Sequence, residues 1–374
     1  MPIKYRYLTY DILSNTILAD LPFTDVSFGE TLNNAGSFNG NLSMFGIDDL
    51  NRDVLEVVKC GILVEADGEI IWNGIIWTVS ADASAQRVRV GAEGTWSYFS
   101  HRMIRASTAE RYIDEEFPRI GLVGPAYDGL DPFTIAQEVV KYVQSETIFG
   151  GNANIHVETQ NTTSGVTIET YEIPSDSYAS ASSVVEDVSG MWDKGFDFRI
   201  IARWQGGKLV KTFVTGYPHL GGRTGHVFEL GKNIITINET INGKELATMV
   251  VGTGEGSGQN QLVTFYSEPG STYPVIDVTK HWPRIEDEMP LAWLTIAAAR
   301  RRRVPLANPS ITTNDTLFPD FTKIIPGDEV YVKVDYGFIQ ISGYYRILGY
   351  DCSPGNDGNT NIRLDLVPTE LFDE

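Results

Sequence analysis

The sequence predicts a mainly β protein in which two similar β-barrel domains flank a mixed α/β middle region. Three observations predict this class. Strand-like alternation dominates both ends of the chain, two helical patterns fall in its middle, and two short segments of the first part recur in the same order in the last part. We place the first barrel at residues 1–103, the middle region at 104–222 and the second barrel at 223–374.

Composition indicates an ordinary soluble globular chain, with 42% hydrophobic and 21% charged residues. Its 374 residues suggest two to three domains at about 150 residues each. No apolar run has the roughly 18 residues that a membrane-spanning helix needs, so we expect no stable membrane insertion. The N-terminal MPIKYRYLTYDIL lacks the continuous apolar core of a signal peptide and is typical of a strand.

The charge balance is strongly acidic. Forty-nine acidic against twenty-nine basic residues give a net charge of −20, which argues against stable binding to nucleic acid phosphates. The two cysteines, Cys60 and Cys352, are too few and too far apart for a disulfide framework. We expect two free thiols and assembly in a reducing cytoplasm.

The first 103 residues alternate as a β domain does. Asp67-Gly68 is a hairpin turn signal between two apolar runs, GILVEA and EIIWNGIIW. The segment 87–90, RVRV, then alternates with the period of two of a half-buried antiparallel strand.

The middle region changes to a helical pattern. Asp131 followed by Pro132 opens a helix, because Asp caps free backbone amides and Pro is tolerated at the first helical position. A second helix is predicted over SSVVEDVSGMWDKG, with Gly195 as its stop. FDFRIIARW and KLVKTFV then form a hairpin around Gly206 and Gly207.

From residue 223 the strand pattern returns, most clearly in DEVYVKVDYGFIQISGYYRILGYD. One inserted helix is predicted over 290–303, starting at Pro290 with LAWLTIAAARRRR behind it and ended by Pro305.

The repeat rests on two pairs of segments. ETLN at 30–33 recurs as ETIN at 239–242, which predicts the same turn in two copies of one fold. DGEIIWNGIIWTVSAD (67–82) matches YGFIQISGYYRILGYD (336–351) without a gap when Gly74 is placed on Gly343. Unrelated hairpins also share glycines and alternation, but the common order of the two pairs favours a duplicated barrel.

These segments resemble the baseplate hub, or tail-tip hub, proteins of long-tailed bacteriophages. The resemblance covers nearly the whole chain and is carried by ADLPFTDVSFGETLNNAGSFNGNL, VRVGAEGTWSYFSHRM, GMWDKGFDFRI and PGDEVYVKV…ISGYYRILGYD…IRLDLVP. It implies a homotrimer in which three chains of two barrels form a pseudo-sixfold ring at the distal end of the virion tail. It also implies a hub without the lytic domain that some relatives carry after the second barrel.

The resemblance further implies partners. The ring would join the hexameric tail tube and distal tail proteins to a threefold central tip or fibre protein, with the tape measure protein as a neighbour. DNA would be only transient cargo through the lumen, and assembly would take place in the host cytoplasm.

No motif for catalysis stands out. The five histidines include no i, i+4 pair, no G-x-S-x-G elbow exists, and GTGEGSG (252–258) lacks the Lys-Ser/Thr and the helix of a phosphate loop. The acidic clusters at 114–116 and 286–288 are typical of solvated surface. We therefore expect a protein that is not an enzyme and has no cofactor, no catalytic residues and no metal site.

One charge run opposes the acidic balance: Arg300, Arg301, Arg302 and Arg303. Two readings stay open. In the first, arginines at the C-terminal end of a helix bind its last carbonyls and interact favourably with the negative end of the helix dipole. In the second, because four arginines exceed what capping needs, they bind an acidic patch on a neighbouring subunit. We take these residues as candidates for a subunit interface, with contact to DNA the weakest reading.

Two other functions remain. A hexameric distal tail adaptor is also a β-rich ring former, but a true hexamer needs only one barrel per chain. A cell-wall glycan hydrolase or carbohydrate-binding tail protein would need a convergent carboxylate pair or an exposed aromatic row.

Overall fold

The computed structural model describes most of the chain. The described residues are 3–45, 52–104, 126–145, 151–172, 179–191, 195–282, 285, 287–355 and 358–369. Within these residues no helix has the length and apolar character needed to cross a membrane. The fold is mainly β, as predicted, with a thirteen-stranded sheet as its largest element.

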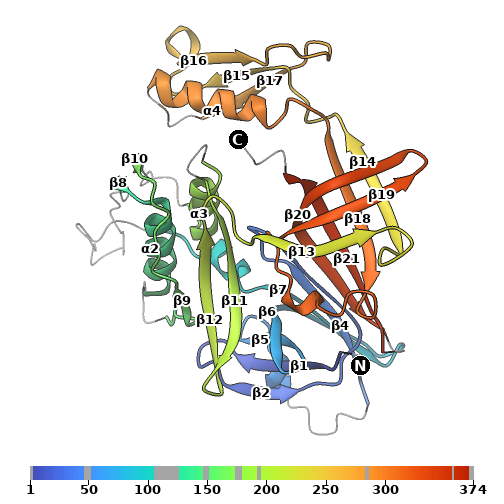
Figure 1. Cartoon of the computed structure of the whole chain (residues 1–374). Helices are drawn as coiled ribbons and strands as arrows, with labels where there is room; N and C mark the ends of the chain where they lie inside the picture. Colours follow the sequence, from blue (N-terminus) through green and yellow to red (C-terminus); the bar gives the residue numbers. More distant parts are fainter. Residues whose placement is uncertain are drawn as a thin grey trace, which may run out of the picture.

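Seven strands of this sheet come from the first part of the chain, which we call the first β unit (Figure 1). Neighbouring strands in it are antiparallel. In sheet order they are β3 (Thr24–Thr31), β4 (Ser37–Ser43), β7 (Arg87–Gly94), β6 (Glu69–Asp82), β5 (Cys60–Ala66), β1 (Tyr5–Asp11) and β2 (Ile17–Asp20).

The other six strands come from the last part of the chain and form the second β unit. In sheet order they are β14 (Thr236–Asn242), β18 (Leu306–Asn314), β21 (Thr360–Pro368), β20 (Ile339–Pro354), β19 (Glu329–Tyr336) and β13 (Arg223–Glu229).

The two units have the same strand order. The strands of the two units correspond one to one when the order β3-β4-β7-β6-β5-β1 is aligned with the order β14-β18-β21-β20-β19-β13. In both orders the strands are visited in the same sequence along the chain. The last pair differs in direction, because β1 is antiparallel to β5 and β13 is parallel to β19. A duplicated topology thus underlies the sequence repeat.

The predicted barrels are not confirmed. Among the described strands neither unit closes on itself, because β3 pairs with β20 of the other unit and makes the two units one continuous sheet. They also bury one common core, in which Phe28, Phe38 and Trp72 of the first unit meet Val330 and Ile347 of the second. Two barrels were expected because alternation shows which residues face inward but not which edges meet.

The repeated hairpin does not keep the register of the sequence match. Its two-residue turns lie at 67–68 and at 337–338, which is 270 positions apart, whereas the match pairs residues 269 positions apart. Gly74 lies opposite Ile62 and Gly343 opposite Val332, and only the first hairpin has a register shift between Val64 and Glu65. Each long strand then carries a β-bulge, around Trp77 in β6 and around Leu348 in β20. The two bulged residues, Trp77 and Leu348, are 271 positions apart, whereas the sequence match pairs residues 269 positions apart. The gapless match is therefore wrong by two residues at this point of the strands.

The tetrapeptides do not mark the same turn. ETLN runs from the end of β3 into a turn at Leu32 and Asn33, whereas all of ETIN lies within β14. The two segments therefore occupy corresponding strands but different places in them, and the prediction of one shared turn was wrong.

The middle region packs helices on small sheets. Helix α2 (Pro132–Ser145) begins as predicted, with the Phe133 N–H donating to Asp131 Oδ1 at 2.9 Å. The hairpin of β11 (Asp197–Gln205) and β12 (Lys208–Gly216) is also as predicted, with β9 (Val157–Thr159) parallel to β12. The remaining elements are α1 (Ser97–Ser100), β8 (Ala126–Leu130), β10 (Ile168–Glu172) and α3 (Ala181–Ser189).

Helix α3 is shorter than the sequence predicted. Its Ser180 side chain accepts from the Ser183 N–H, and it ends at Gly190 rather than at Gly195. Gly195 instead lies where the chain enters β11, and a Cβ there would lie 2.5 Å from the Ser189 carbonyl oxygen.

Strand β5 shows why the first β unit and the middle region stay together. All seven of its residues are buried, without the alternation of a half-exposed strand. Ile62 and Val64 face the core of the two β units, while Leu63 between them faces the core of the middle region. A continuous apolar run is what a strand between two cores requires.

A separate unit is inserted between β14 and β18, and Figure 1 shows it above the rest of the molecule. It contains a three-stranded sheet of β16 (Val263–Ser267), β15 (Met249–Thr253) and β17 (Asp277–His281), with helix α4 (Glu288–Arg300) packed on one side. The sequence predicted the helix over 290–303 and strand patterns in ELATMVVGT and QLVTFYS, but it assigned all of them to the second barrel and not to a separate unit. The helix begins two residues earlier and ends three residues earlier, and Pro290 is tolerated because it lies in the first turn.

Three short 3-10 helices complete the described elements: η1 (Arg52–Leu55), η2 (Gly258–Asn260) and η3 (Phe321–Lys323). Cys60 and Cys352 are free thiols, as predicted, and both are buried.

Candidate functional site

The most elaborate polar structure of the protein lies where the first β unit, the second β unit and the middle region meet. We call it the three-way joint and define it by Glu30, Asn33, Asp197, Arg199, Arg346 and Tyr350. Its frame is the pairing of β3 with β20, in which Glu30 lies opposite Tyr350 and Gly29 opposite Asp351.

Gly29 permits the close approach of these two strands. A Cβ at this position would lie 2.4 Å from Asp351 Oδ1 and 2.5 Å from the Tyr350 carbonyl oxygen. Because one of these atoms belongs to the backbone, a larger residue would have to push the strands apart.

The first contact of the joint is a buried ion pair. Arg199 of β11 donates from Nη2 to Glu30 Oε2 at 2.8 Å, and the two side chains are 11% and 12% exposed. Tyr350 adds its hydroxyl, which donates to the Ile71 carbonyl at 3.0 Å and lies 3.5 Å from the same Glu30 oxygen. Burial raises the pKa of Glu30, and the Arg199 guanidinium counters part of that rise.

The second contact is centred on Asp197, two residues before Arg199 on the same strand. Its Oδ1 accepts from Asn33 Nδ2 at 3.1 Å, and its Oδ2 accepts from the Leu220 N–H at 2.9 Å. Arg346 of β20 forms a buried ion pair with the same Oδ2. One carboxylate thus ties the turn after β3 to the second β unit.

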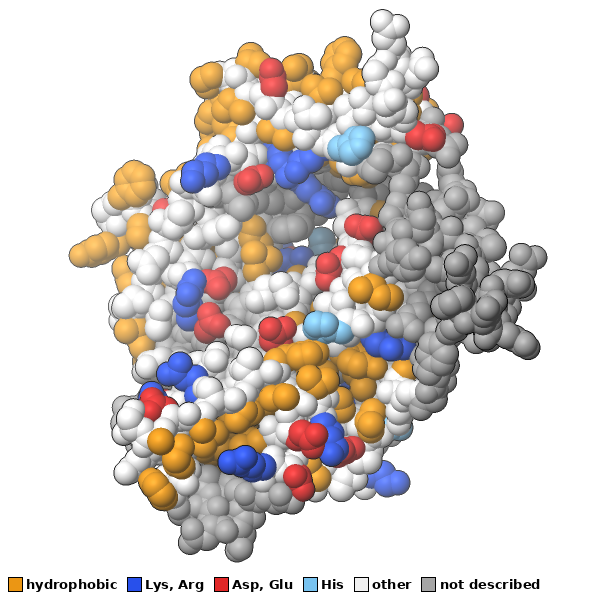
Figure 2. Space-filling view, turned by 180° about the vertical axis from the view of Figure 1, so that it is seen from behind, with side chains coloured by type: hydrophobic (Ala, Val, Ile, Leu, Met, Phe, Trp, Pro, Cys, Tyr) orange, Lys and Arg blue, Asp and Glu red, His pale blue; other side chains and the backbone are white. Residues whose placement is uncertain are grey.

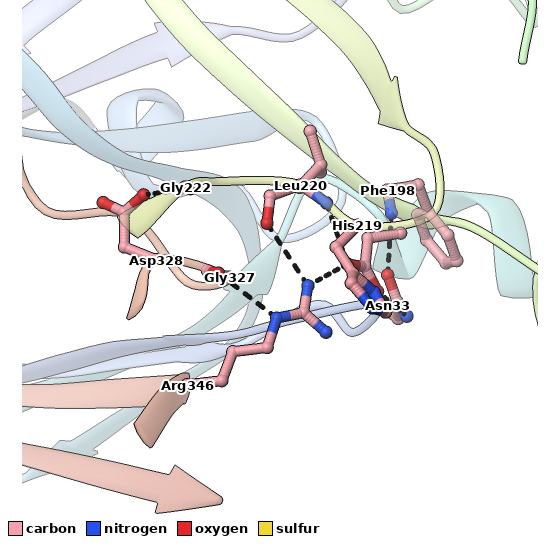
Figure 3. A network of polar contacts seen from close by, with 9 residues as sticks. Asn33, Phe198, His219, Leu220, Gly222, Gly327, Asp328 and Arg346 are labelled. Atoms are coloured by element: carbon pink, nitrogen blue, oxygen red, sulfur yellow. Dashed lines mark hydrogen bonds and ion pairs between the residues drawn. The ribbon is translucent and has the colours of Figure 1, made fainter. Parts of the chain in front are cut away.

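Arg346 and Asn33 are themselves fixed. Arg346 Nε donates to the Gly327 carbonyl at 3.2 Å, and Asn33 Oδ1 accepts from the Phe198 N–H at 2.7 Å (Figure 3). His219 lies nearby, with Nδ1 3.8 Å from Asp197 Oδ2. Each charge of the joint therefore has a partner, as buried charges require.

A cavity of about 510 Å³ lies beside the joint. Residues of all three parts line it, among them Trp72, Arg199, Phe321 and Tyr350. Four charged residues line it: Glu30 and Arg199, which form the ion pair of the joint, and Glu69 and Arg203. The contacts of the joint link three parts of the chain at the wall of this cavity.

The arginine run is not continuous helix. Only Arg300 lies in α4, Arg301 is its C-terminal cap, and Arg302 and Arg303 follow in a turn. The prediction that the helix extends to Arg303 was wrong, because the chain turns after Arg300 and the backbone N–H groups of Arg302 and Arg303 donate to the Ala299 and Arg300 carbonyls. On the face in Figure 2, basic side chains gather on the lower side of the inserted unit, above a hollow in the surface.

Arg302 makes a capping contact. Arg302 Nη1 donates to the Ala298 carbonyl at 3.3 Å, and its Nη2 lies 3.7 Å from Glu245 Oε2. The Arg302 carbonyl accepts from the Ala247 N–H at 3.0 Å, which fixes the turn to the base of β15. The side chains of Arg300 and Arg301 are exposed.

The histidines lie apart and make structural contacts. The His101 ring packs at a tilt against Trp77, with ring centroids 4.6 Å apart. His156 Nε2 lies 2.7 Å from the Leu13 carbonyl oxygen, and His281 Nδ1 lies 2.8 Å from Thr253 Oγ1. No group of three possible metal ligands occurs in the part of the chain that the structure describes.

The remaining sequence features are loops or helix ends. The loop predicted over GTGEGSG is confirmed for residues 254–257, whereas Gly252 and Thr253 end β15 and Gly258 begins η2. Of the second acidic cluster, Asp287 is the N-terminal cap of α4 and Glu288 its first residue, where negative charge is favoured. The cluster at 114–116 and Glu286 lie outside the described residues.

Sequence reasoning missed the joint. Asp197 and Arg199 alternate with aromatic and aliphatic residues in FDFRI, and Arg346 lies in the apolar run YYRIL. A charged residue inside an otherwise buried strand needs a partner, so this signal was present. It does not reveal which partner, since the members of the two pairs are 169 and 149 positions apart.

Comparisons with known proteins give relatives by structure alone. No protein-family model matches the sequence, and no curated protein matches it. The 43 kDa tail protein of prophage MuSo2 from Shewanella oneidensis is similar, with a TM-score of 0.64 at 10% identity, over 98% of this chain and 100% of that one.

Two further tail proteins have the same architecture. The tail protein from Neisseria meningitidis MC58 matches with a TM-score of 0.61 at 12% identity, over 98% of this chain and 97% of that one. Prophage tail protein gp18 from Listeria monocytogenes EGD-e matches with a TM-score of 0.54 at 12% identity, over 96% and 94%. The resemblance predicted from the sequence is thus confirmed at the level of the fold: over nearly its whole length, the chain has the fold of phage tail proteins.

Proposed function

We propose that the protein is a structural hub of a phage tail tip, in which three copies form a ring of six similar β units. The observation that carries this proposal is the common strand order of the two β units. A chain with two equivalent units can meet a sixfold neighbour on one side of the ring. It can still present threefold symmetry to a central tip on the other side.

The three-way joint supports this role. A ring of two-unit chains needs the units of each chain in one fixed arrangement, and the β3–β20 pairing with its two buried ion pairs provides that. The likeness to tail proteins extends over nearly all of this chain and of theirs, which supports a role in the tail.

The partners follow from the ring. On the sixfold side these are the tail tube and distal tail proteins, with the tape measure protein nearby, and on the threefold side a central tip or fibre protein. The site is the distal end of the virion tail, after assembly in the host cytoplasm. A net charge of −20 suits a ring through which DNA passes without binding.

We propose no catalysis by this chain. The buried charges of the joint neutralise each other, and the histidines of the described residues are dispersed. We also propose that the exposed Arg300 and Arg301 contact an acidic surface of a neighbouring subunit, through the bidentate geometry that Arg favours with carboxylates.

The test is the mass of the native particle. Native mass spectrometry of the purified protein, together with its copy number in intact tails, should give three copies. Six copies of this chain would instead indicate the distal tail adaptor. A stable monomer that degrades cell-wall glycan would overturn both readings.

A further inference from the structure

Two of the open strand edges in the described part of the large sheet correspond to the edges that pair inside the chain. Strand β14 is the last strand of the sheet and pairs only with β18 among the described strands. The second open edge belongs to the far end of β6. Its partner β5 reaches only to Ile75, so residues 78–82 pair with β7 alone in the described part of the chain. All five of these residues are exposed.

The corresponding edges inside the chain are not open, because they pair with each other. Strand β3 is the counterpart of β14, and β20 is the counterpart of β6. In the β3–β20 pairing Gly349 lies opposite Thr31, Tyr350 opposite Glu30, and Cys352 opposite Phe28. The contact between the two units of one chain is therefore made by β3 and β20, the counterparts of the two strands whose edges are open, β14 and β6.

The bulges fix which residues of the long strands correspond. In β6 the first pair beyond the bulge is Thr78 with Gly91, and in β20 it is Gly349 with Asp365. Thr78 is thus the counterpart of Gly349, and the next residue, Val79, is the counterpart of Tyr350.

Following the residue pairs from strand to strand shows which residues of the edge strands β3 and β14 correspond. Gly91 lies opposite Asn39, which lies opposite Ser27. In the second unit Asp365 lies opposite Ser310, which lies opposite Asn238. Asn238 is therefore the counterpart of Ser27, and counting three residues onward makes Ile241 the counterpart of Glu30.

Exposure agrees with this correspondence. Tyr350 is 7% exposed where β3 covers it, while its counterpart Val79 is 38% exposed. Ile241, on the open edge of β14, is 54% exposed. Two large apolar side chains are therefore left uncovered at the two positions that the internal pairing would bring opposite each other.

We propose that β14 of one copy of this chain pairs antiparallel with residues 78–81 of β6 in the next copy. The register follows from the internal joint: Thr78 opposite Asn242, Val79 opposite Ile241, Ser80 opposite Thr240 and Ala81 opposite Glu239. Backbone hydrogen bonds satisfy both edges, and the Val79–Ile241 pair buries apolar surface.

This contact is head-to-tail, because each copy offers one edge of each kind, and such contacts generate closed rings when the rotation permits. The inference rests on the proposed function and adds to it a specific interface. The contact between chains repeats the contact within a chain, so all six β units of a trimer have near-equivalent neighbours.

Disulfide trapping tests the register. Residues directly opposite in antiparallel strands have Cα atoms about 4.5 to 5.5 Å apart, within the range of a disulfide. Val79→Cys combined with Ile241→Cys in the full chain should give a ladder of covalent dimers and trimers under mild oxidation. The native Cys60 and Cys352 are buried and give no background.

The matched control is Val79→Cys with Thr240→Cys. A shift of one residue places the second thiol on the opposite face of the strand, so this pair should link at least about tenfold less. Each single-cysteine variant should melt like the wild type, because Val79, Thr240 and Ile241 are exposed.

The outcomes separate the interface from the function. A native mass of three copies, without links between the thiols introduced at positions 79 and 241, would overturn the strand pairing and leave the hub proposal standing. Equal linking of the control pair would overturn the register. Links in an assembly of another size would keep the pairing and overturn the trimer, and a monomer at every concentration would overturn both.

Charge variants provide a second measurement. Val79→Lys with Ile241→Lys places like charges opposite each other and should weaken the ring about tenfold or more. Val79→Lys with Ile241→Glu should recover most of that loss in sedimentation analysis. Equal weakening by both double variants would contradict a direct pair.

Discussion

Arg199 and Glu30 form an ion pair at 2.8 Å although they are 169 positions apart, and both side chains are nearly buried. Glu30 lies on the strand that joins the two β units, and Arg199 lies on the hairpin of the middle region. The pair therefore connects all three parts of the chain at one point.

Replacing one member of this pair should be costly. Glu30→Ala leaves the Arg199 guanidinium buried without its partner, and such a loss typically destabilises by about 3 to 5 kcal/mol. Urea unfolding followed by tryptophan fluorescence measures the change. The double variant Glu30→Ala with Arg199→Ala should cost less than the sum of the single variants, and simple additivity would contradict the pairing.

Asp197 and Arg346 form the second buried ion pair of the joint, and its contribution to stability can be compared with that of an exposed ion pair. Arg346→Met removes the charge but keeps the length of the side chain, and leaves Asp197 with only neutral partners and the half-exposed His219. We expect a loss of about 3 kcal/mol. Replacing the exposed Arg363, whose pair with Asp365 lies at the surface, should change stability by less than about 1 kcal/mol. Equal losses would argue against a special role of the joint.

The contact of β3 with β20 depends on a glycine. Gly29→Ala places a methyl group against Asp351 and the Tyr350 carbonyl, so it should lower stability by about 2 kcal/mol or more. Gly343→Ala on β20 is the matched control, because a Cβ there meets nothing within 4 Å. Thermal melts of the two variants should differ clearly, and similar melting temperatures would show that the strands separate without cost.

The buried Lys211 should make the stability of the fold depend on pH in an unusual way. It is fully buried, with Nζ 4.9 Å from the centroid of the Tyr10 ring and without a hydrogen-bond partner among the described residues. Burial lowers its pKa to about 7, against a partial counter-effect of Asp11. The unfolded chain then binds more protons than the folded one between about pH 7 and 10.4, so this group makes stability rise with pH in that window.

Lys211→Met should remove that rise. The variant should be more stable than the wild type at pH 7, and the difference should shrink toward pH 10, by at most about 1.4 kcal/mol per pH unit. Urea unfolding at several pH values measures it. Lys208→Met on the exposed start of the same strand is the control and should leave the slope unchanged. A wild-type slope in Lys211→Met would contradict the assignment.

The arginine run now separates into two roles. Arg302→Ser should lower the stability of the inserted unit by about 1 kcal/mol, because it removes a bond to the Ala298 carbonyl. Arg301→Ser should leave stability unchanged and weaken incorporation of the subunit into tails. Incorporation is measured by the copy number in purified particles, and normal incorporation of Arg301→Ser would count against an interface at this residue.

Sequence pattern was sufficient for the local elements. Alternation and turn residues predicted the hairpins around Asp67-Gly68 and Gly206-Gly207, and the Asp131-Pro132 start of α2, because strand period, turn conformation and helix capping depend on neighbouring residues. The resemblance to tail proteins also came from such patterns, although identity to the similar structures is only 10 to 12%.

Only the tertiary structure decided how the edges meet. Nothing local in ETLN shows that β3 pairs with β20 or that Glu30 forms an ion pair with Arg199. The local pattern also does not show that the predicted helix and its neighbouring strands form a unit separate from the large sheet. Strand pairing and buried ion pairs are made between residues that are distant in sequence. Their partners are selected by the packing of the whole chain, whereas the sequence alone determined which segments were fit to become strands, turns and helices.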